Sequence, residues 1–358
     1  MIRVSIIGLG LIGGSLAKSF KNTYADNIEI TGYDSPDVLD EAIEVKVIDK
    51  KVLFPEDAAD SNIIFLCLPT ELSLTALSKL APEINEDTII SDVAGVKGIF
   101  EMEWSALKSK GKFIGGHPMT GKERGGFENS DPLLFENSVY ILSDKKIESK
   151  NYSLFIELIN SLGARIRFLD PFLHDEIVAN VSHLPQLLSV ALVNAASETK
   201  GDINYLDFAA GGFRDMTRIA SSDFKIWQSV IKHNRDSILR SIESFEAVFK
   251  KVKSFVKNDD YKSLAELFES SRLKRDEIPK NTKGFINPLT DIFVFVKDEP
   301  GVLSRLTSIL FENNINIKDL ELLKIREGTG GTFRISFESQ AEADTAEKLI
   351  EGLGFRTK

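Results

Sequence analysis

The stretch RVSIIGLGLIGGSLA, residues 3–17, decides the fold. A β-branched apolar run ends at a glycine, and an apolar stretch with helical spacing follows the third glycine. Glycines at this spacing between a strand and a helix allow a tight turn and close approach of the backbone to a pyrophosphate, which the helix N-terminus attracts. The stretch predicts the first βα unit of a dinucleotide-binding domain, with five cofactor-binding residues: Gly8, Gly10, Leu11, Ile12 and Gly13.

An acidic residue favours one cofactor over its phosphorylated form. Asp34 ends the second predicted strand, IEITGYD, about 20 residues after the glycines, where a carboxylate can bind a ribose diol. It also repels a 2′-phosphate, and Ser35 and Pro36 supply no arginine to bind one. We therefore expect NAD rather than NADP. Pro69 and Thr70, after the strand NIIFLCLP, are expected beside the ribose or nicotinamide, although Thr70 fits a helix N-cap equally well.

Three stretches of the chain have different patterns. Up to about residue 170, short β-branched runs alternate with helical stretches, which predicts an α/β Rossmann domain with a mostly parallel, doubly wound sheet at 1–170. Apolar residues at helical spacing predict an all-helical domain at 171–285 that shapes the substrate cleft and forms a homodimer. After a Gly- and Pro-containing linker, the order βαββαβ predicts a ferredoxin-like module at 290–358.

Composition excludes several classes of function. The 358 residues carry a formal net charge of −10, which argues against nucleic acid or an anionic membrane as a partner. No apolar run approaches the length of a membrane span. The single cysteine, Cys67, lies in an apolar run and is expected in the core of a protein of a reducing compartment such as the cytoplasm. We expect no metal site.

The loop GGHPMTGKERGG, residues 115–126, carries one of only four histidines. It follows a predicted strand, at the sheet edge where ligands of open α/β folds bind. Hydride removal from an alcohol carbon needs an acceptor for the hydroxyl proton, and imidazole titrates in the right range. His117 is therefore a candidate base, although a structural histidine with hydrogen-bonded nitrogens fits the same pattern.

Five strings in this order complete the pattern: GLGLIGGSLA, SDVAGVKG, GGHPMTGKERGG, SHLPQ and AAGGFRDMTRIASSDFKIW. Together they resemble the prephenate dehydrogenase family over roughly residues 4–280, and DEPGVLSRL near the C-terminus resembles an ACT domain. The resemblance implies oxidative decarboxylation of prephenate by NAD, giving 4-hydroxyphenylpyruvate, carbon dioxide and NADH. It identifies His117 as the base and Arg218 as the arginine that binds a substrate carboxylate, with Asp215 placed to orient it.

The same resemblance suggests further substrate-binding residues. Glu123 and Trp227 match positions that line the site in the family, and His183 is expected to face the cleft; a solvated loop charge, a core tryptophan and a structural histidine are the alternatives. His174 is expected to cap or pack a helix, and His233 to be solvated.

Two residues depart from the family pattern. Gly95 stands where the family usually has a serine that helps to place the histidine and the nicotinamide, so Ser91 or Lys97 could take that role. Gln186 stands where many relatives have a second histidine. Glutamine cannot carry a proton or a positive charge, so arogenate, which has an amino group in place of the keto group of prephenate, becomes an alternative substrate, as does dual cyclohexadienyl activity.

The C-terminal module suggests regulation by an amino acid. An effector, with tyrosine favoured, is expected at the start of its first helix and before its second strand, with four residues in contact: Asp298, Pro300, Gly301 and Asn316. A plain turn in a module used only for dimer contacts is the alternative. For the whole chain, two other functions stay open: a non-catalytic NAD or amino-acid sensor, and a β-hydroxyacid dehydrogenase, which would need a catalytic lysine that the helical stretch lacks.

Overall fold

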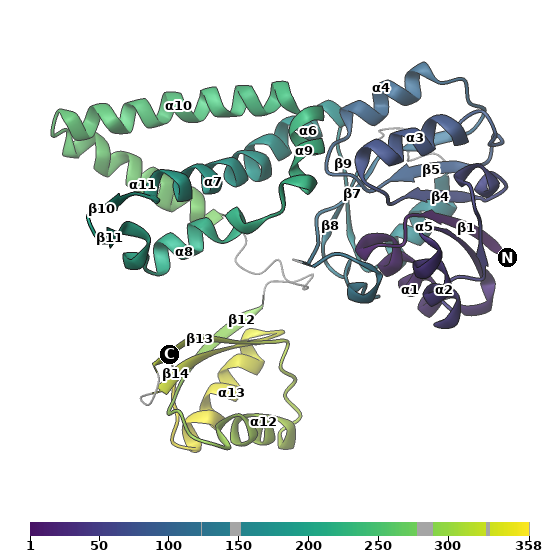
Figure 1. Ribbon diagram of the computed structural model, residues 1–358. Helices are drawn as coiled ribbons and strands as arrows, with labels where there is room; N and C mark the ends of the chain where they lie inside the picture. Colours follow the sequence, from purple (N-terminus) through teal and green to yellow (C-terminus); the bar gives the residue numbers. More distant parts are fainter. Residues whose placement is uncertain (123, 144–151, 278–288, 327–329, 358) are drawn as a thin grey trace. The chain divides into compact units, whose positions relative to one another are not determined.

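A computed structural model describes residues 1–122, 124–143, 152–277, 289–326 and 330–357. These residues form two compact units, Met1–Arg275 and Asp276–Lys358 (Figure 1). The first unit contains the predicted parallel sheet, with strand order β3-β2-β1-β4-β5-β6. Its strands are β1 (Ile2–Ile7), β2 (Ile28–Tyr33), β3 (Lys50–Lys51), β4 (Ile63–Leu66), β5 (Ile89–Asp92) and β6 (Lys112–Ile114). The order reverses beside β1, as in a doubly wound dinucleotide fold, so the predicted fold class is confirmed.

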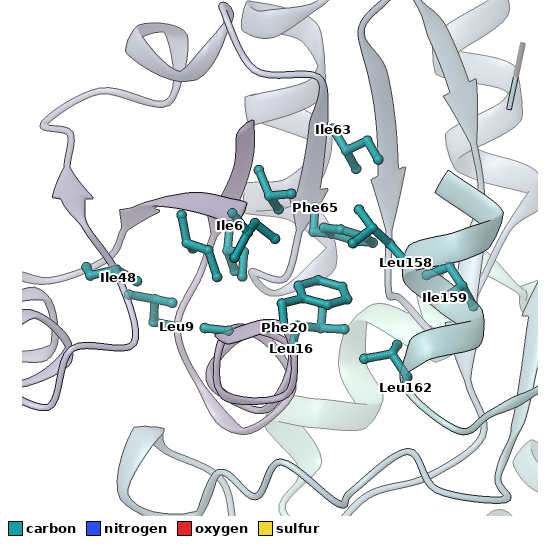
Figure 2. Close-up of a cluster of buried hydrophobic side chains, with 14 of the residues drawn as sticks. Ile6, Leu9, Leu16, Phe20, Ile48, Ile63, Phe65, Leu158, Ile159 and Leu162 are labelled. Atoms are coloured by element: carbon teal, nitrogen blue, oxygen red, sulfur yellow. The ribbon is translucent and has the colours of Figure 1, made fainter. Parts of the chain in front are cut away.

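Two apolar clusters cover the two faces of this sheet. Ile6 and Phe65 pack with Phe20 and Leu158 on one face, as Figure 2 shows, while Ile7 and the adjacent strand positions pack on the other. The helices that supply these layers are α1 (Leu11–Tyr24), α2 (Pro36–Glu44), α3 (Thr70–Leu80), α4 (Gly98–Ala106) and α5 (Ser153–Ser161). Burial on both faces explains why the strands read as continuous apolar runs rather than as alternating ones.

The run KFIGGHP, residues 112–118, forms two strands that belong to different sheets. β6 ends at Ile114, and β7 (Gly116–Pro118) pairs antiparallel with β8 (Val139–Leu142), which pairs parallel with β9 (Arg165–Phe168). The break lies at Gly115, where a Cβ atom would come within 2.1 Å of the Ser143 hydroxyl. Only glycine fits this close approach, which starts a second, three-stranded sheet.

The second part of the first unit is helical. It contains α6 (Pro171–Val178), a π-helical turn (Ala179–His183), α7 (Leu184–Ala196), α8 (Gly211–Thr217), α9 (Phe224–His233), α10 (Arg235–Lys257) and α11 (Tyr261–Glu277). The expectation of helices alone was wrong in one detail, because β10 (Thr199–Lys200) and β11 (Ile203–Asn204) form a small hairpin that turns at Gly201, with φ of 63°. Among the described residues, Pro171–Ala196 is long and apolar enough to cross a membrane by length and composition, which is weak evidence for a membrane span because the core helix of a soluble protein can meet the same criterion.

The second unit has the predicted order βαββαβ. Its elements are β12 (Thr290–Val296), α12 (Val302–Glu312), β13 (Asp319–Arg326), β14 (Gly330–Phe337), α13 (Gln340–Gly352) and β15 (Arg356–Thr357). They form an antiparallel sheet of order β13-β14-β12-β15, and Val294, Leu306, Ile335 and Ile350 are buried in its core.

Candidate active site

The glycine loop has the geometry of a pyrophosphate site. Gly8 has φ of 105°, and a Cβ atom there would lie 2.7 Å from the Cys67 carbonyl carbon. A Cβ atom at Gly13 would lie 1.8 Å from the Gly8 oxygen, whereas one at Gly10 would meet nothing within 4 Å. The first and third glycines therefore make the turn possible and the second faces open space. α1 begins at Leu11 with no acidic residue in its first turn and no side-chain cap, so its N-terminal amides are available to an anion.

Asp34 is placed to bind a ribose and to brace the loop. Its Oδ2 accepts a hydrogen bond from the Leu9 amide at 2.6 Å, and its Oδ1 accepts one from the Ser35 amide at 2.7 Å. It lines a hollow of about 470 Å³ with largely apolar walls that suit an adenine: Phe54, Pro55, Leu68 and Leu72. The cation at its rim, Lys79, lies 3.1 Å from Glu56, which compensates its charge. The hollow therefore fits the adenosine of NAD.

Pro69 and Thr70 lie where β4 leads into α3. Thr70 is the first residue of α3, Pro69 occupies the cap position, and neither makes a capping side-chain hydrogen bond. The N-cap interpretation of Thr70 was therefore wrong. Its side chain is nearly buried.

His117 lies within β7 rather than just past a strand, and it contacts a second histidine. Its Nδ1 is 2.8 Å from Nε2 of His174, whose Nδ1 is in turn 2.8 Å from Oδ1 of Asp175. The two imidazole rings meet edge to face at 72°. His174 is fully buried on α6 and does not cap it, because the cap is Asp170, which accepts hydrogen bonds from the Phe172 and Leu173 amides. His174 was thus missed as a site residue.

Burial, together with the charge of Lys97, keeps His117 neutral. Removal from water lowers its pKa well below the usual value, and His174 and Lys97 lower it further. A neutral imidazole can accept a proton at pH 7. The arrangement therefore places an imidazole that can accept a proton next to the carboxyl end of β5, through the contact between Gly116 and Asp92.

A buried ion pair holds the strand that carries this base. Lys97 is fully buried, forms an ion pair with Asp92, and donates to the Gly116 carbonyl at 2.6 Å. Asp92 also accepts from the Gly116 amide at 3.3 Å. Burial lowers the pKa of Lys97, and the Asp92 carboxylate opposes that shift. Lys97 thus supports the backbone beside His117 rather than its ring, whereas Ser91 makes a long contact, 3.4 Å, to the Asp92 carbonyl.

The predicted substrate residues of the helical part lie along the π-helical turn and the helices around it. His183 ends that turn and is buried, with Nδ1 3.2 Å from the Asn234 amide nitrogen and its ring edge-on to Trp227. Burial lowers the pKa of His183 to about 4. Asn234, which sequence reasoning missed, also donates to the Asp175 carbonyl at 2.7 Å. π-Helical turns recur at functional sites because they displace side chains from regular helical positions.

Gln186 and Arg218 are connected through one backbone turn. Gln186 is buried, and its Nε2 donates to the Ile219 carbonyl at 2.9 Å. Arg218 is exposed at the start of the turn Arg218–Ser221, directly after α8, which carries the exposed Asp215. Glu123 lies outside the described residues. The expectation that His233 is solvated was wrong: its side chain is 11% exposed and its Nε2 lies 3.2 Å from Glu71 of α3.

The second unit has a small hollow at the predicted effector position. Its volume is about 210 Å³, and its lining includes Asp298 and Gly301, with Leu322 and Phe333 across from them in the sheet. Gly301 precedes α12 with φ of 87°, a conformation that favours glycine. Pro300 and Asn316 do not line this hollow, and Asn316 is exposed.

Comparison with known proteins places the chain. It is 32% identical to prephenate dehydrogenase of Bacillus subtilis over 354 residues, which is 97% of this chain and 95% of that protein. This chain belongs to the prephenate dehydrogenase family. Three parts of the chain match known family domains. Residues 16–168 match the nucleotide-binding domain of prephenate dehydrogenase, residues 170–270 match its dimerization domain, and residues 290–354 match an ACT domain.

Two solved structures of the family resemble the chain. Prephenate dehydrogenase from A. aeolicus, in complex with hydroxyphenyl propionate and NAD+, is 30% identical with a TM-score of 0.71 and covers 78% of this chain and 98% of that one. Synechocystis arogenate dehydrogenase is also 30% identical, with a TM-score of 0.69, and covers 77% of this chain and 99% of that one.

Proposed function

We propose that this protein is an NAD-dependent prephenate dehydrogenase, which converts prephenate to 4-hydroxyphenylpyruvate and carbon dioxide in tyrosine biosynthesis. The observation that carries the proposal is the neutral His117, held at the carboxyl edge of a dinucleotide-binding sheet by a buried hydrogen-bonded partner. Family membership and the fit of the glycine loop and Asp34 to NAD support it. The single cysteine and the family's biosynthetic enzymes agree with a cytoplasmic protein.

The residues divide the chemistry between them. The glycine loop and Asp34 would hold the pyrophosphate and a ribose of NAD, which would supply the hydride acceptor when bound. His117 accepts a hydrogen bond from the hydroxyl of the substrate and takes its proton as the hydride leaves the same ring carbon. Carbon dioxide departs from the opposite ring carbon, and the electron pair of the broken carbon–carbon bond makes the ring aromatic. The proton returns to the ring oxygen to form the phenol, so no net proton is released.

Prephenate is a dicarboxylate, so its site needs a cation. Arg218 is the proposed carboxylate ligand, because a guanidinium can bind a carboxylate through two parallel hydrogen bonds. Asp215, His183, Trp227 and Gln186 are proposed to line the same site, as is Glu123. Pro69, Thr70 and Gly95 are proposed to border the nicotinamide end of the cofactor.

Arogenate is the second candidate substrate. Gln186 is neutral and commits its amide nitrogen to a backbone carbonyl, so it offers no positive charge to a keto acid. The deciding experiment measures NADH formation at 340 nm with prephenate and with arogenate in parallel. Turnover with prephenate that collapses in His117→Asn supports the proposal. Turnover with arogenate alone makes the enzyme an arogenate dehydrogenase, and no turnover with either favours a non-catalytic sensor.

We further propose feedback inhibition by tyrosine at the ACT domain. Asp298 and Gly301 line a hollow at the start of α12, where a free amino acid could bind. Deleting residues 290–358 is expected to keep activity and to abolish inhibition by added tyrosine. A truncated enzyme that stays fully inhibited would place inhibition at the active site instead.

The helical part is the proposed homodimer surface. Its long helices expose large apolar side chains, among them Phe249 at 59% and Phe268 at 74%, and the matching family description is a dimerization domain. Light scattering of the purified protein is expected to give twice the chain mass. A Phe249→Glu variant that remains folded is expected to shift this value toward the monomer.

A further inference from the structure

We propose that His174 and Asp175 set the tautomer of His117 and thereby position the base. Gly95 has no side chain that could do this. The inference rests on the proposed function, because it concerns how His117 is prepared to accept the hydroxyl proton. His174 and Asp175 are positioning residues in this proposal; they do not touch the substrate.

The donor and acceptor of each hydrogen bond between Asp175, His174 and His117 can be assigned by starting from Asp175. Its Oδ1 accepts from the Lys97 amide at 2.7 Å and its Oδ2 from the Gly98 amide at 2.8 Å. A carboxyl group that accepts on both oxygens is in its ionised, acceptor-only form. The third contact, from Oδ1 to Nδ1 of His174 at 2.8 Å, therefore requires the proton on that ring nitrogen.

The same donor and acceptor rule, applied to His174, determines which nitrogen of His117 carries the proton. A neutral imidazole with a proton on Nδ1 has a bare Nε2. That bare nitrogen lies 2.8 Å from Nδ1 of His117, which must then be the donor. The proton on Nδ1 leaves Nε2 of His117 as an acceptor for the substrate hydroxyl, as in catalytic triads where a carboxylate fixes the tautomer of the base.

On the other side of the His117 ring, residue 95 offers no such anchor. A Cβ atom at Gly95 would lie 3.9 Å from both Cε1 and Nε2 of His117, so this position faces the reactive nitrogen and offers no hydroxyl. His117 is therefore positioned through its Nδ1, on the side of the ring away from the reactive Nε2. Because Asp175 lies on α6 and binds amides at the start of α4, its carboxylate also connects the helical part to the nucleotide-binding part.

Asp175→Asn tests the tautomer. If the new amide group donates to Nδ1 of His174, it moves the proton of that ring to Nε2, which then donates to His117 and forces its proton onto the reactive nitrogen. We expect kcat with prephenate to fall by up to about 10⁴-fold, the effect of tautomer inversion at a triad histidine, with KM for prephenate and NAD nearly unchanged. The tautomer itself is read from ¹⁵N shifts of the imidazole nitrogens, and four histidines make the assignment by single substitution practical.

His174→Phe is the second variant, which removes the partner of His117 and leaves the two amide contacts of Asp175 in place. Asp170→Asn is the matched control, because it replaces an N-cap carboxylate on the same helix outside this chain of hydrogen bonds. Asparagine caps helices about as well as aspartate, so we expect Asp170→Asn to stay folded, with kcat within about threefold of the wild type. A wild-type spectrum with the His117 proton on Nε2 overturns the proposal, as does an unchanged kcat in folded His174→Phe.

Failure of this proposal can be distinguished from failure of the proposed function. A wild-type protein that oxidises neither prephenate nor arogenate contradicts the function. The ¹⁵N spectrum of the same sample still shows which nitrogen of His117 carries the proton and decides the positioning.

Discussion

Nε2 of Gln186 donates a hydrogen bond to the Ile219 carbonyl at 2.9 Å, which attaches α7 to the turn that begins with Arg218. The bond is partly shielded from water, since Gln186 is 4% exposed and Ile219 is half-buried. The glutamine thus has a structural task in addition to any contact with substrate. Its replacement of the histidine common in the family keeps an N–H donor at this place.

Gln186→Leu is expected to raise KM for prephenate roughly tenfold with a smaller effect on kcat. The variant leaves a partly buried carbonyl without its donor, which costs up to about 1–3 kcal/mol, and loosens the turn that begins with Arg218. Gln186→His is the matched control, because it can keep a donor at the same place. Steady-state kinetics that show equal KM for wild type and Gln186→Leu would contradict this account.

Arg218→Lys is expected to raise KM for prephenate by roughly 10–100-fold. Lysine keeps the charge but cannot form two parallel hydrogen bonds to a carboxylate, and charge-assisted bonds are worth about 1.5–3 kcal/mol. Arg214→Lys serves as control, since Arg214 lies on α8 and donates to the Ala209 carbonyl. Equal effects of the two substitutions would remove the special role of Arg218.

The sequence predicts the fold well because glycines and buried strands carry strong local signals. Gly8 has a positive φ and Gly13 approaches the Gly8 oxygen within the same turn, while β4 and β5 are buried at every position. The break at Gly115 escaped prediction because its cause, the close approach of Ser143, is a tertiary contact between residues far apart in the sequence.

The site was predicted less completely, for the same reason. His117 stands out in a glycine-rich loop, but its partner His174 lies on an amphipathic helix where a packing histidine is equally reasonable. Only the fold brings the two rings together across 57 positions of the chain. His233 reads as solvated because its neighbours are polar, and the contact with Glu71, 162 positions away, is likewise invisible in the sequence.

The pH profile follows from the lowered pKa of His117. In the proposed mechanism His117 acts in its neutral form, and burial keeps that form populated below the usual histidine pKa of 6.5. We therefore expect kcat/KM with prephenate to stay level from pH 8 to well below 6.5 and to fall only as the pH passes the lowered pKa. An acid limb centred at or above 6.5 would show that His117 is solvated in the free enzyme.

The lowered pKa of His183 makes the free energy of unfolding depend on pH between about 4 and 6.5. Its folded pKa is about 4, against 6.5 for an unperturbed histidine, so between these values the unfolded chain binds a proton that the folded chain does not. The contribution to the free energy of unfolding is complete above pH 6.5 and is lost as the pH falls toward 4, at up to about 1.4 kcal/mol per pH unit. His183→Phe, which keeps a ring against Trp227, removes this proton uptake. Chemical denaturation at several pH values is expected to show a smaller loss of stability between pH 6.5 and 4 in the variant, and parallel curves would mean that His183 titrates normally in the folded protein.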